Sequence, residues 1–238
     1  MSGPLAGLFG ALLGEMSGRN EFSVFLDDVK RKRILGGLFD QYYEDCPAEV
    51  VFDTGRAWCA RMSAITELFP DAKVIACVRQ LPWIIDSIER LVQRNTFSPS
   101  SIFNYTPNGT VYTRANGVAT SDGLVGFAYD ALKQACFGAQ ADRLLLVQYE
   151  TLVDDPAKVL QAIYGFIGEK PFAHDFEHIE YDVAEFDKRA GTPGLHTVRS
   201  KVETSPRKTL LPPDLFQRFA NDAFWHDPKR IPEELRVV

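Results

Sequence analysis

Residues 70–92 read PDAKVIACVRQLPWIIDSIERLV, and the order of apolar and polar residues in them indicates the fold class. Its segment 73–78 is a continuous apolar run after a Pro-Asp turn, a pattern typical of a short strand covered on both faces of a parallel sheet. A helix can open at Pro82, a residue suited to the first helical turn. Aliphatic residues then recur at helical spacing: Ile84, Ile85, Ile88, Leu91 and Val92. The stretch therefore predicts a strand followed by an amphipathic helix.

Two further apolar runs predict strands, at residues 50–52 and 143–148. Apolar residues at helical spacing follow each run. The helix after the second run is bounded by Asp155, a capping residue, and by Gly168 at its end. Strand–helix units in this order predict an α/β fold with a mostly parallel sheet flanked by helices.

The length and charge of the chain limit the class of protein. Its 238 residues fit a single domain over 1–238, and 45% hydrophobic residues are enough for a sizeable core. The formal net charge is −6, whereas nucleic-acid-binding proteins are usually basic, so no nucleic-acid partner is predicted. Net charge says nothing about one site, so a local basic pocket for a small anion stays open.

The cysteines and the apolar runs indicate the compartment. The four cysteines form no C-x-x-C pair and mostly stand among apolar residues, which predicts buried, reduced thiols in a cytoplasmic protein. No apolar run approaches the ~18 residues of a membrane span, so no membrane partner is predicted.

Two segments interrupt the alternation of strands and helices. Residues 96–121 are rich in Ser, Thr, Asn, Pro and Gly with interspersed aromatic residues, and a segment of this length favours a substrate-side loop. Residues 186–213 are basic and contain glycines, a composition that can carry an anion site. The first segment could also be a surface excursion without a functional role, and the second could be a solvated tail.

Polar residues follow the apolar run 73–78, where open α/β sheets bind their ligands. Arg79 comes directly after this run, and Ser87 follows eight residues on in the predicted helix. A guanidinium fork and a hydroxyl donor could face one phosphate. Spacing alone also fits a surface ion pair for Arg79.

Three stretches in order resemble the family of sulfotransferases that use 3′-phosphoadenosine 5′-phosphosulfate (PAPS). They are VFDTGRAW at 51–58, ELFPDAKVIACVRQLPWIIDSIERL at 67–91 and LLLVQYETLVDDPAKVLQAIYGFIG at 144–168. RAGTPGLHTV at 189–198 is similar to the loop that closes over the nucleotide in bacterial members. The resemblance implies a sheet like that of P-loop NTPases, PAPS as co-substrate, and adenosine 3′,5′-bisphosphate as product.

Carried over residue by residue, the resemblance implies a nucleotide site. Its candidate residues are Arg79, Ser87, Tyr149, Arg189, Gly191 and Gly194. The first two would hold the 3′-phosphate, Tyr149 would lie near the nucleotide, and the last three would cover its 3′-phosphate or adenine side. A packing role for Tyr149 and a solvent-facing role for Arg189 stay open.

The candidates for catalysis are Asp53, Arg56 and His196. Asp53 ends the run 50–52 like the acidic end of a Walker B strand, and in a kinase it would approach Mg²⁺. In a sulfotransferase it would orient Arg56 or accept the proton of the acceptor, and Arg56 would stabilise the bridging oxygen. A structural Asp–Arg pair stays open. His174 and His178 lack an evident third ligand, so no metal site is predicted.

The signature loop of the family, Gly-x-Pro-Arg-Ser-Gly-Ser/Thr after a strand, does not occur in the sequence. We therefore expect the N-terminal strand and its phosphosulfate-binding loop to be missing. Each lost charge-assisted hydrogen bond would remove about 1.5–3 kcal/mol, which predicts a weak or inactive catalyst.

The sequence thus predicts transfer of a sulfuryl group from PAPS to a hydroxyl or amine of a small-molecule or peptide acceptor. Two alternatives stay open. One is a kinase of P-loop architecture that uses Mg²⁺ and ATP, and the other is a degenerate, non-catalytic binding module. Neither the acceptor nor the oligomeric state is predicted.

Overall fold

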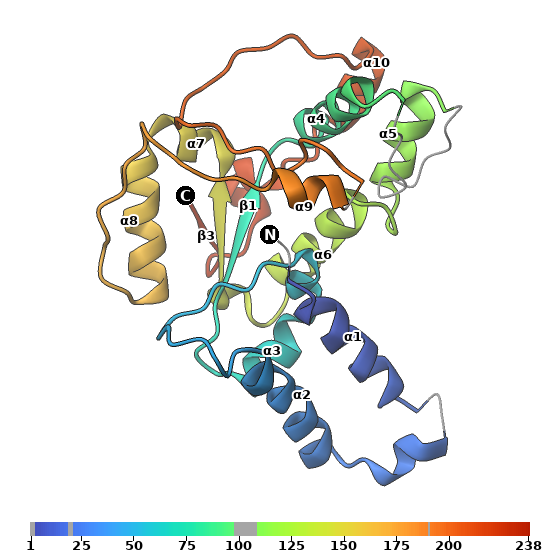
Figure 1. Cartoon of the computed structure of the whole chain (residues 1–238), viewed down its shortest axis with the longest axis vertical. Helices are drawn as coiled ribbons and strands as arrows, with labels where there is room; N and C mark the ends of the chain where they lie inside the picture. The colour runs from blue at the N-terminus through green and yellow to red at the C-terminus, as the bar shows by residue number, and fades with distance from the viewer. Residues whose placement is uncertain (1–2, 19–20, 98–108, 190) are drawn as a thin grey trace. The chain divides into compact units, whose positions relative to one another are not determined.

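The computed structural model describes residues 3–18, 21–97, 109–189 and 191–238 (Figure 1). The chain divides into two compact units, Met1–Ala72 and Lys73–Val238. This division does not test the prediction of a single domain over residues 1–238, which stays a prediction.

The described residues of the N-terminal unit form helices. α1 (Leu5–Glu15) and α2 (Asp28–Tyr42) are joined through the 3₁₀ turn η1 (Glu21–Phe25), and η2 (Arg56–Arg61) and α3 (Met62–Leu68) follow (Figure 1). Asp27 caps α2 by accepting a hydrogen bond from the Lys30 N–H at 2.8 Å. The core of this unit contains these residues: Leu5, Phe9, Met16, Leu35 and Trp58.

The prediction of a strand at residues 50–52 is wrong. These residues are not in a strand, and the side chain of Phe52 is 65% exposed. A strand needs a neighbour to satisfy its backbone hydrogen-bonding groups. The described part of the N-terminal unit contains only helices and irregular segments, so the apolar triplet has no sheet to join.

The C-terminal unit contains a small parallel sheet flanked by helices. Within the described residues its strand order is β1 (Val74–Val78), β2 (Leu144–Gln148), β3 (Arg236–Val237). β1 pairs with β2 from Val74 opposite Leu144 to Val78 opposite Gln148. The two strands predicted from apolar runs are therefore confirmed, and the fold is mixed α/β. β2 is buried along its apolar run, whereas Cys77 in β1 is exposed.

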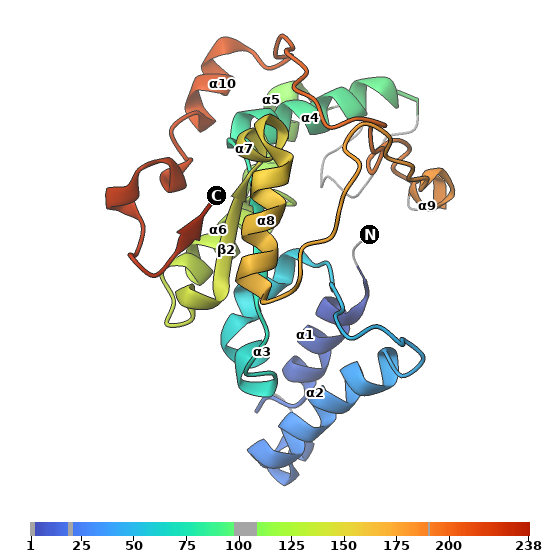
Figure 2. The same ribbon diagram turned by 90° about the vertical axis from the view of Figure 1, so that its left-hand side faces the viewer.

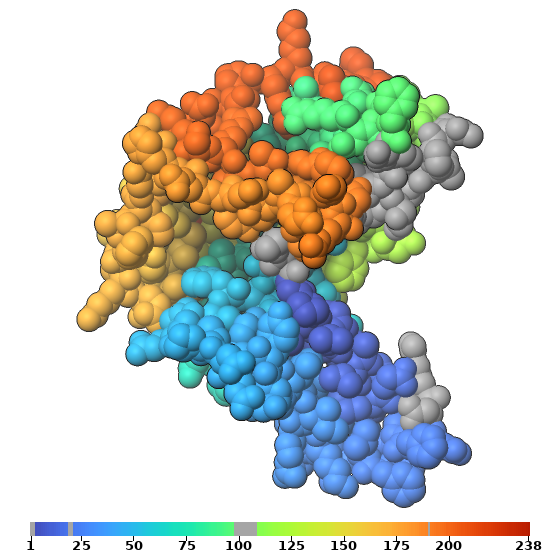
Figure 3. Space-filling view, in the orientation of Figure 1, coloured from blue at the N-terminus to red at the C-terminus, as the bar shows by residue number. Residues whose placement is uncertain are grey.

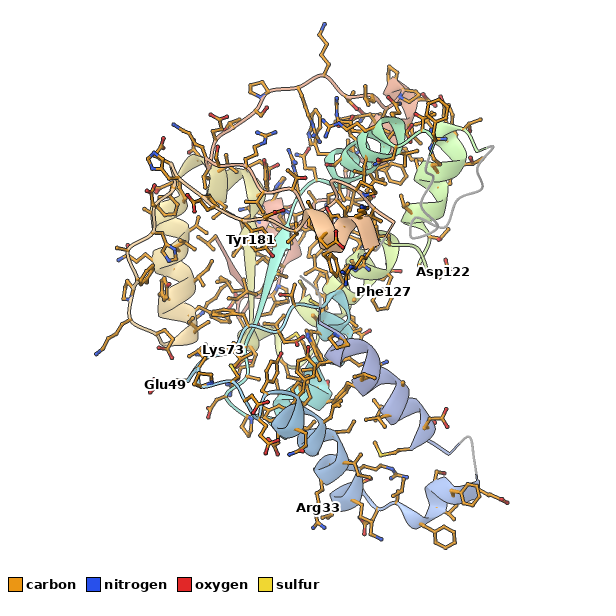
Figure 4. All side chains as sticks on the ribbon, in the orientation of Figure 1. Arg33, Glu49, Lys73, Asp122, Phe127 and Tyr181 are labelled. Atoms are coloured by element: carbon orange, nitrogen blue, oxygen red, sulfur yellow. The ribbon has the colours of Figure 1, made fainter. Side chains whose placement is uncertain are left out.

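Two helices predicted after these strands are also confirmed. α4 (Leu81–Arg94) carries Pro82 in its first turn, and α8 (Pro156–Ile167) begins after Asp155, whose carboxylate accepts from the Lys158 N–H at 3.1 Å. Gly168 ends α8 with φ 84°, the left-handed conformation that glycine adopts most readily. α8 packs along β2 (Figure 2). Lys73 directly precedes β1 (Figure 4), and its Nζ donates to the Phe166 carbonyl of α8 at 2.6 Å.

A second core of the C-terminal unit joins α4 to α5 (Val111–Ala119) and α10 (Pro213–Phe219), and α6 (Gly126–Cys136) follows α5. The segment 96–121, predicted as a loop, therefore contains a helix. Thr110 caps it by accepting from the Thr113 N–H at 3.3 Å. Residues 98–108 of that segment lie outside the described residues.

The remaining elements are short. They are η4 (Ala141–Arg143), α7 (Tyr149–Asp154), α9 (Ala184–Arg189), η5 (Phe224–His226) and η6 (Pro228–Arg230). All four cysteines, each in a described part of the chain, are free, but Cys46 and Cys77 are exposed rather than buried as predicted. No helix among the described residues is long and apolar enough to cross a lipid bilayer.

Candidate functional site

Arg79 and Tyr149 lie side by side because β1 and β2 end together. The register pairs Val78 with Gln148, so the next residue of each strand emerges at the same edge of the parallel sheet. The guanidinium carbon of Arg79 lies 3.9 Å from the centre of the Tyr149 ring. Its Nε lies 3.5 Å from Glu150 Oε1. The ring and the carboxylate together fix the plane of the guanidinium.

Asp86 is a buried carboxylate that ties the segment 207–210 to α4. Its side chain is 0% exposed. Oδ1 accepts from Thr209 Oγ1 at 3.0 Å and from the Leu210 N–H at 2.6 Å. Oδ2 faces Arg90 Nε at 2.9 Å and Arg207 Nη2 at 3.1 Å. These four donors satisfy the hydrogen-bonding capacity of the buried carboxylate.

Arg207 is thereby brought to the edge of the sheet where Arg79 lies. Its Nη2 also donates to the Trp83 carbonyl at 3.3 Å. Burial lowers the pKa of Arg207; the attraction of Asp86 opposes this, and the positive charges of Arg90 and Arg79 add to it. These arginines are therefore close enough to repel one another. Binding an anion beside them would relieve that repulsion.

Two guanidinium N–H groups of the described residues at this place make no hydrogen bond, although Arg79 Nε has the ion-pair contact with Glu150. Within the described part of the chain, the Nε atoms of Arg79 and Arg207 are buried and make no hydrogen bond. A buried donor without an acceptor is costly, whereas a phosphate offers several charged oxygens to such donors. The strand-end arginines therefore form a candidate site for a phosphate-like anion.

Two other predicted nucleotide residues are exposed. Ser87 follows Asp86 on α4 and is exposed, so its role toward a phosphate stays a prediction. Arg189 ends α9 and pairs through Nε with Glu185 Oε1 at 2.9 Å, with 80% of its side chain exposed. A surface ion pair of this kind contributes little to stability.

The segment 191–194 forms a turn that is attached to α4. Gly191 has φ 66° and Gly194 has φ 82°, conformations that favour glycine. Asn95, at the end of α4, donates from Nδ2 to the Pro193 carbonyl at 3.1 Å. In Figure 3 the orange segment that includes this turn meets the green surface of α4.

His196 follows this turn and pairs with Asp187. Its Nδ1 lies 2.6 Å from Asp187 Oδ1, and its backbone N–H donates to Oδ2 at 2.9 Å. Burial alone would raise the pKa of Asp187, but the hydrogen bonds from the backbone and ring of His196 outweigh it and lower this pKa. The carboxylate is therefore held ionised beside the ring.

Asp53 and Arg56 belong to the N-terminal unit. Asp53 accepts from Tyr43 Oη and from Trp58 Nε1, each at 2.6 Å, so its carboxylate links the residue that follows α2 to η2. Burial and then the bond to Asp53 raise the pKa of Tyr43. Arg56 begins η2 and is exposed. The catalytic roles of Asp53 and Arg56 stay predictions.

We expect Tyr43→Phe to lower the free energy of unfolding by about 1.5–3 kcal/mol, the range for a hydrogen bond to a charged group. The Asp53 carboxylate would lose one of its two donors. Urea denaturation measures the change. The matched control is Tyr42→Phe, because Tyr42 is 47% exposed. Equal losses in the two variants would contradict a structural role for the bond to Asp53.

Sequence reasoning missed the partners of two predicted residues. Arg207 lies within the predicted basic loop 186–213, but no sequence pattern indicated that it shares a site with Arg79. Asp86 looks like any polar residue of an amphipathic helix. Asp187 was not singled out as the partner of His196. The only local signal was the basic composition of the loop.

The comparisons with known proteins give one match. The model described as "Sulfotransferase family" matches residues 27–173, which is more than half of the chain. No curated protein and no solved structure shows a significant match. The matched range contains Arg79 and Tyr149, whereas Arg207 and His196 follow it.

Proposed function

The chain belongs to the sulfotransferase family, and on this premise we propose that it transfers a sulfuryl group, at a reduced rate, from PAPS to a hydroxyl or amine of a small-molecule or peptide acceptor. The proposal includes a sheet related to that of P-loop NTPases, a bacterial type of the family and a cytoplasmic location. One observation carries it: Arg79 and Arg207 present two buried N–H donors that make no hydrogen bond within the described chain.

In this proposal Arg79 and Arg207 bind the 3′-phosphate of the nucleotide. A guanidinium fork matches the geometry of phosphate oxygens. Tyr149 orients Arg79 by stacking, and Asp86 holds Arg207 through an ion pair. PAPS supplies the sulfuryl group, and adenosine 3′,5′-bisphosphate leaves. The chain contributes through positioning and electrostatic stabilisation.

A kinase would use Asp53 in a different role from a sulfotransferase. It would need this carboxylate to approach Mg²⁺, but both oxygens already accept hydrogen bonds from Tyr43 and Trp58. Sulfuryl transfer needs no metal ion, because the sulfuryl group carries less charge than a terminal phosphoryl group. The metal requirement of nucleotide binding therefore separates the two functions.

We expect the full chain to bind adenosine 3′,5′-bisphosphate in the absence of Mg²⁺. Adenosine 5′-monophosphate should bind about a thousandfold more weakly, because it offers no 3′-phosphate to the two arginines. Isothermal titration calorimetry with and without Mg²⁺ measures both affinities. Binding of ATP that requires Mg²⁺, with no preference for the bisphosphate, would favour the kinase instead.

Transfer is measured separately from binding, with ³⁵S-labelled PAPS and a panel of hydroxyl and amine acceptors. Label that appears in an acceptor supports the proposed enzyme. Binding of the bisphosphate without any transfer would instead support a non-catalytic binding module.

A further inference from the structure

We infer that one end of the hairpin formed by α1 and α2 is a docking surface for a bilayer that contains anionic phospholipids. We call it the η1 surface, and it consists of Phe22, Val24, Phe25, Val29, Lys30 and Arg33. Such a surface lies on a bilayer and needs no helix that crosses it. The inference goes beyond the proposed function and does not depend on it, because the proposed nucleotide site contains none of these residues.

The apolar side chains of the η1 surface are exposed. Phe22, Val24, Phe25 and Val29 are between 64% and 78% exposed. Figure 1 shows the segment that contains η1 at one end of the hairpin of α1 and α2. A single exposed apolar residue needs no explanation, whereas several in one short segment mark a site of interaction.

The geometry of η1 places the two phenylalanine rings on one face. Residues three apart in a 3₁₀ helix stand above one another, so Phe22 and Phe25 share the outer face. Ser23 and Leu26 share the inner face: Ser23 is buried, and Leu26 packs against the core of the N-terminal unit. The Leu26 N–H donates to the Ser23 carbonyl at 3.1 Å. The exposure of the rings therefore follows from the fold of the turn.

Arg31 holds this turn in place. Its Nε donates to the Met16 carbonyl at 3.1 Å, and its Nη2 donates to the Ser23 carbonyl at 3.3 Å. Its Nη1 pairs with Asp28 Oδ1 at 2.9 Å. One guanidinium thus links the end of α1, the turn η1 and the first turn of α2. Because the turn is already ordered, binding through its rings costs little conformational entropy.

Two cations stand beside the rings. Lys30 and Arg33 are three residues apart on α2, so they share a face of the helix, and both are exposed. The Lys30 Nζ donates to the Phe25 carbonyl at 3.3 Å, which places its charge next to the apolar group. Figure 4 shows Arg33 on the same helix. Apolar rings flanked by cations are typical of segments that lie at a membrane surface.

The acidic residues nearby do not outweigh these cations. Residues 21–34 contain four basic and three acidic residues, in a chain whose net charge is −6. Two of the acidic residues are engaged within the unit, since Asp27 caps α2 and Asp28 pairs with Arg31. The third, Glu21, is exposed. The local excess of positive charge complements anionic headgroups.

The apolar area of the η1 surface is too small for a stable dimer. A specific protein interface buries about 800 Å² on each partner. Two phenylalanines that are about seven-tenths exposed supply at most about 350 Å², and the two valines have smaller side chains. A bilayer requires no minimum area of this kind, because each ring enters the boundary between headgroups and acyl chains separately. A lipid surface is therefore the occupant that this area and charge fit.

The test is co-sedimentation of the full chain with vesicles. One set of vesicles contains phosphatidylcholine alone, and the other contains equal parts of phosphatidylcholine and phosphatidylglycerol. We expect binding to the anionic vesicles and at least tenfold weaker binding to the neutral ones. Raising NaCl from about 0.1 M to about 1 M should weaken the binding, because the Debye length falls from about 10 Å to about 3 Å.

Two double variants separate the apolar part of the surface from the charged part. Phe22→Ser with Phe25→Ser should weaken binding about a hundredfold or more, because no ring then enters the bilayer. Lys30→Ala with Arg33→Ala should weaken it about twenty-five-fold, since each basic residue near an anionic surface contributes about fivefold.

Each double variant has a control in the C-terminal unit. Phe172→Ser changes a phenylalanine that is 70% exposed, as Phe22 is. Lys158→Ala with Lys170→Ala removes two exposed cations. Both controls should bind the anionic vesicles as the unchanged chain does. Urea denaturation should give the same midpoint for all variants, because every substituted side chain is exposed.

Insertion is measured separately, with Phe22→Trp. Brominated phosphatidylcholine in the anionic vesicles should quench the emission of this variant more than that of the unchanged chain, which has three tryptophans. Three results would overturn the inference: no binding of the unchanged chain to anionic vesicles, equal losses in the serine double variant and in Phe172→Ser, or no added quenching in Phe22→Trp. A dimer that forms without vesicles and is lost in the serine double variant would also overturn it, because a second copy would then cover the surface.

Discussion

Alanine at both Arg79 and Arg207 is expected to weaken the binding of adenosine 3′,5′-bisphosphate about a thousandfold. A hydrogen bond to a charged group contributes about 1.5–3 kcal/mol, so loss of two such guanidinium contacts removes about 4 kcal/mol. Isothermal titration calorimetry measures the affinity.

Two control variants separate this effect from a general loss of positive charge. Arg143→Ala removes an arginine at the opposite end of β2 from Tyr149, and it should leave the affinity unchanged. Arg79→Lys keeps the charge but loses the fork and the planar stacking on Tyr149, so it should give an intermediate loss. An equal loss in Arg143→Ala and the double variant would contradict a specific anion site.

Replacement of Asp86 by asparagine is expected to lower the free energy of unfolding by about 3–5 kcal/mol, the cost of breaking a buried ion pair by removing one partner. Arg90 and Arg207 would each lose the charge that faces them at Oδ2. The segment 207–210 would lose part of its attachment to α4, so the affinity for adenosine 3′,5′-bisphosphate should fall as well.

The control for Asp86 is an exposed aspartate of the same unit. Asp214 accepts from Tyr112 Oη at 2.9 Å on the surface, and Asp214→Asn should cost less than about 1 kcal/mol. Urea denaturation of both variants measures the difference. Equal destabilisation would mean that the buried network around Asp86 does not hold the segment 207–210 in place.

Much of the C-terminal unit could be predicted from sequence, because local patterns determine its main elements. The apolar run of β2 has no polar side on which to face water, and Asp155 and Gly168 mark the ends of α8. The sequence also showed that Arg79 and Tyr149 each follow an apolar run directly, and the structure shows that these two runs are neighbouring parallel strands. The stacking of the two side chains confirms that they lie together.

The partners that complete the two sites could not be predicted in the same way. Arg207 and Asp86 are more than a hundred residues apart in the sequence. Local sequence patterns carry no information about a contact of this kind. Asp187 contacts His196 only because the turn with Gly191 and Gly194 reverses the chain. A short apolar run is also ambiguous by itself, which is why residues 50–52 were wrongly predicted as a strand.

In the proposed function, Arg79 and Arg207 together recognise the 3′-phosphate of an adenosine nucleotide. The most direct test is the ratio of the affinities for adenosine 3′,5′-bisphosphate and adenosine 5′-monophosphate, measured by calorimetry in the unchanged chain and in the double alanine variant. The ratio should be about a thousand in the unchanged chain and close to one in the variant. The same ratio in both proteins would contradict this recognition.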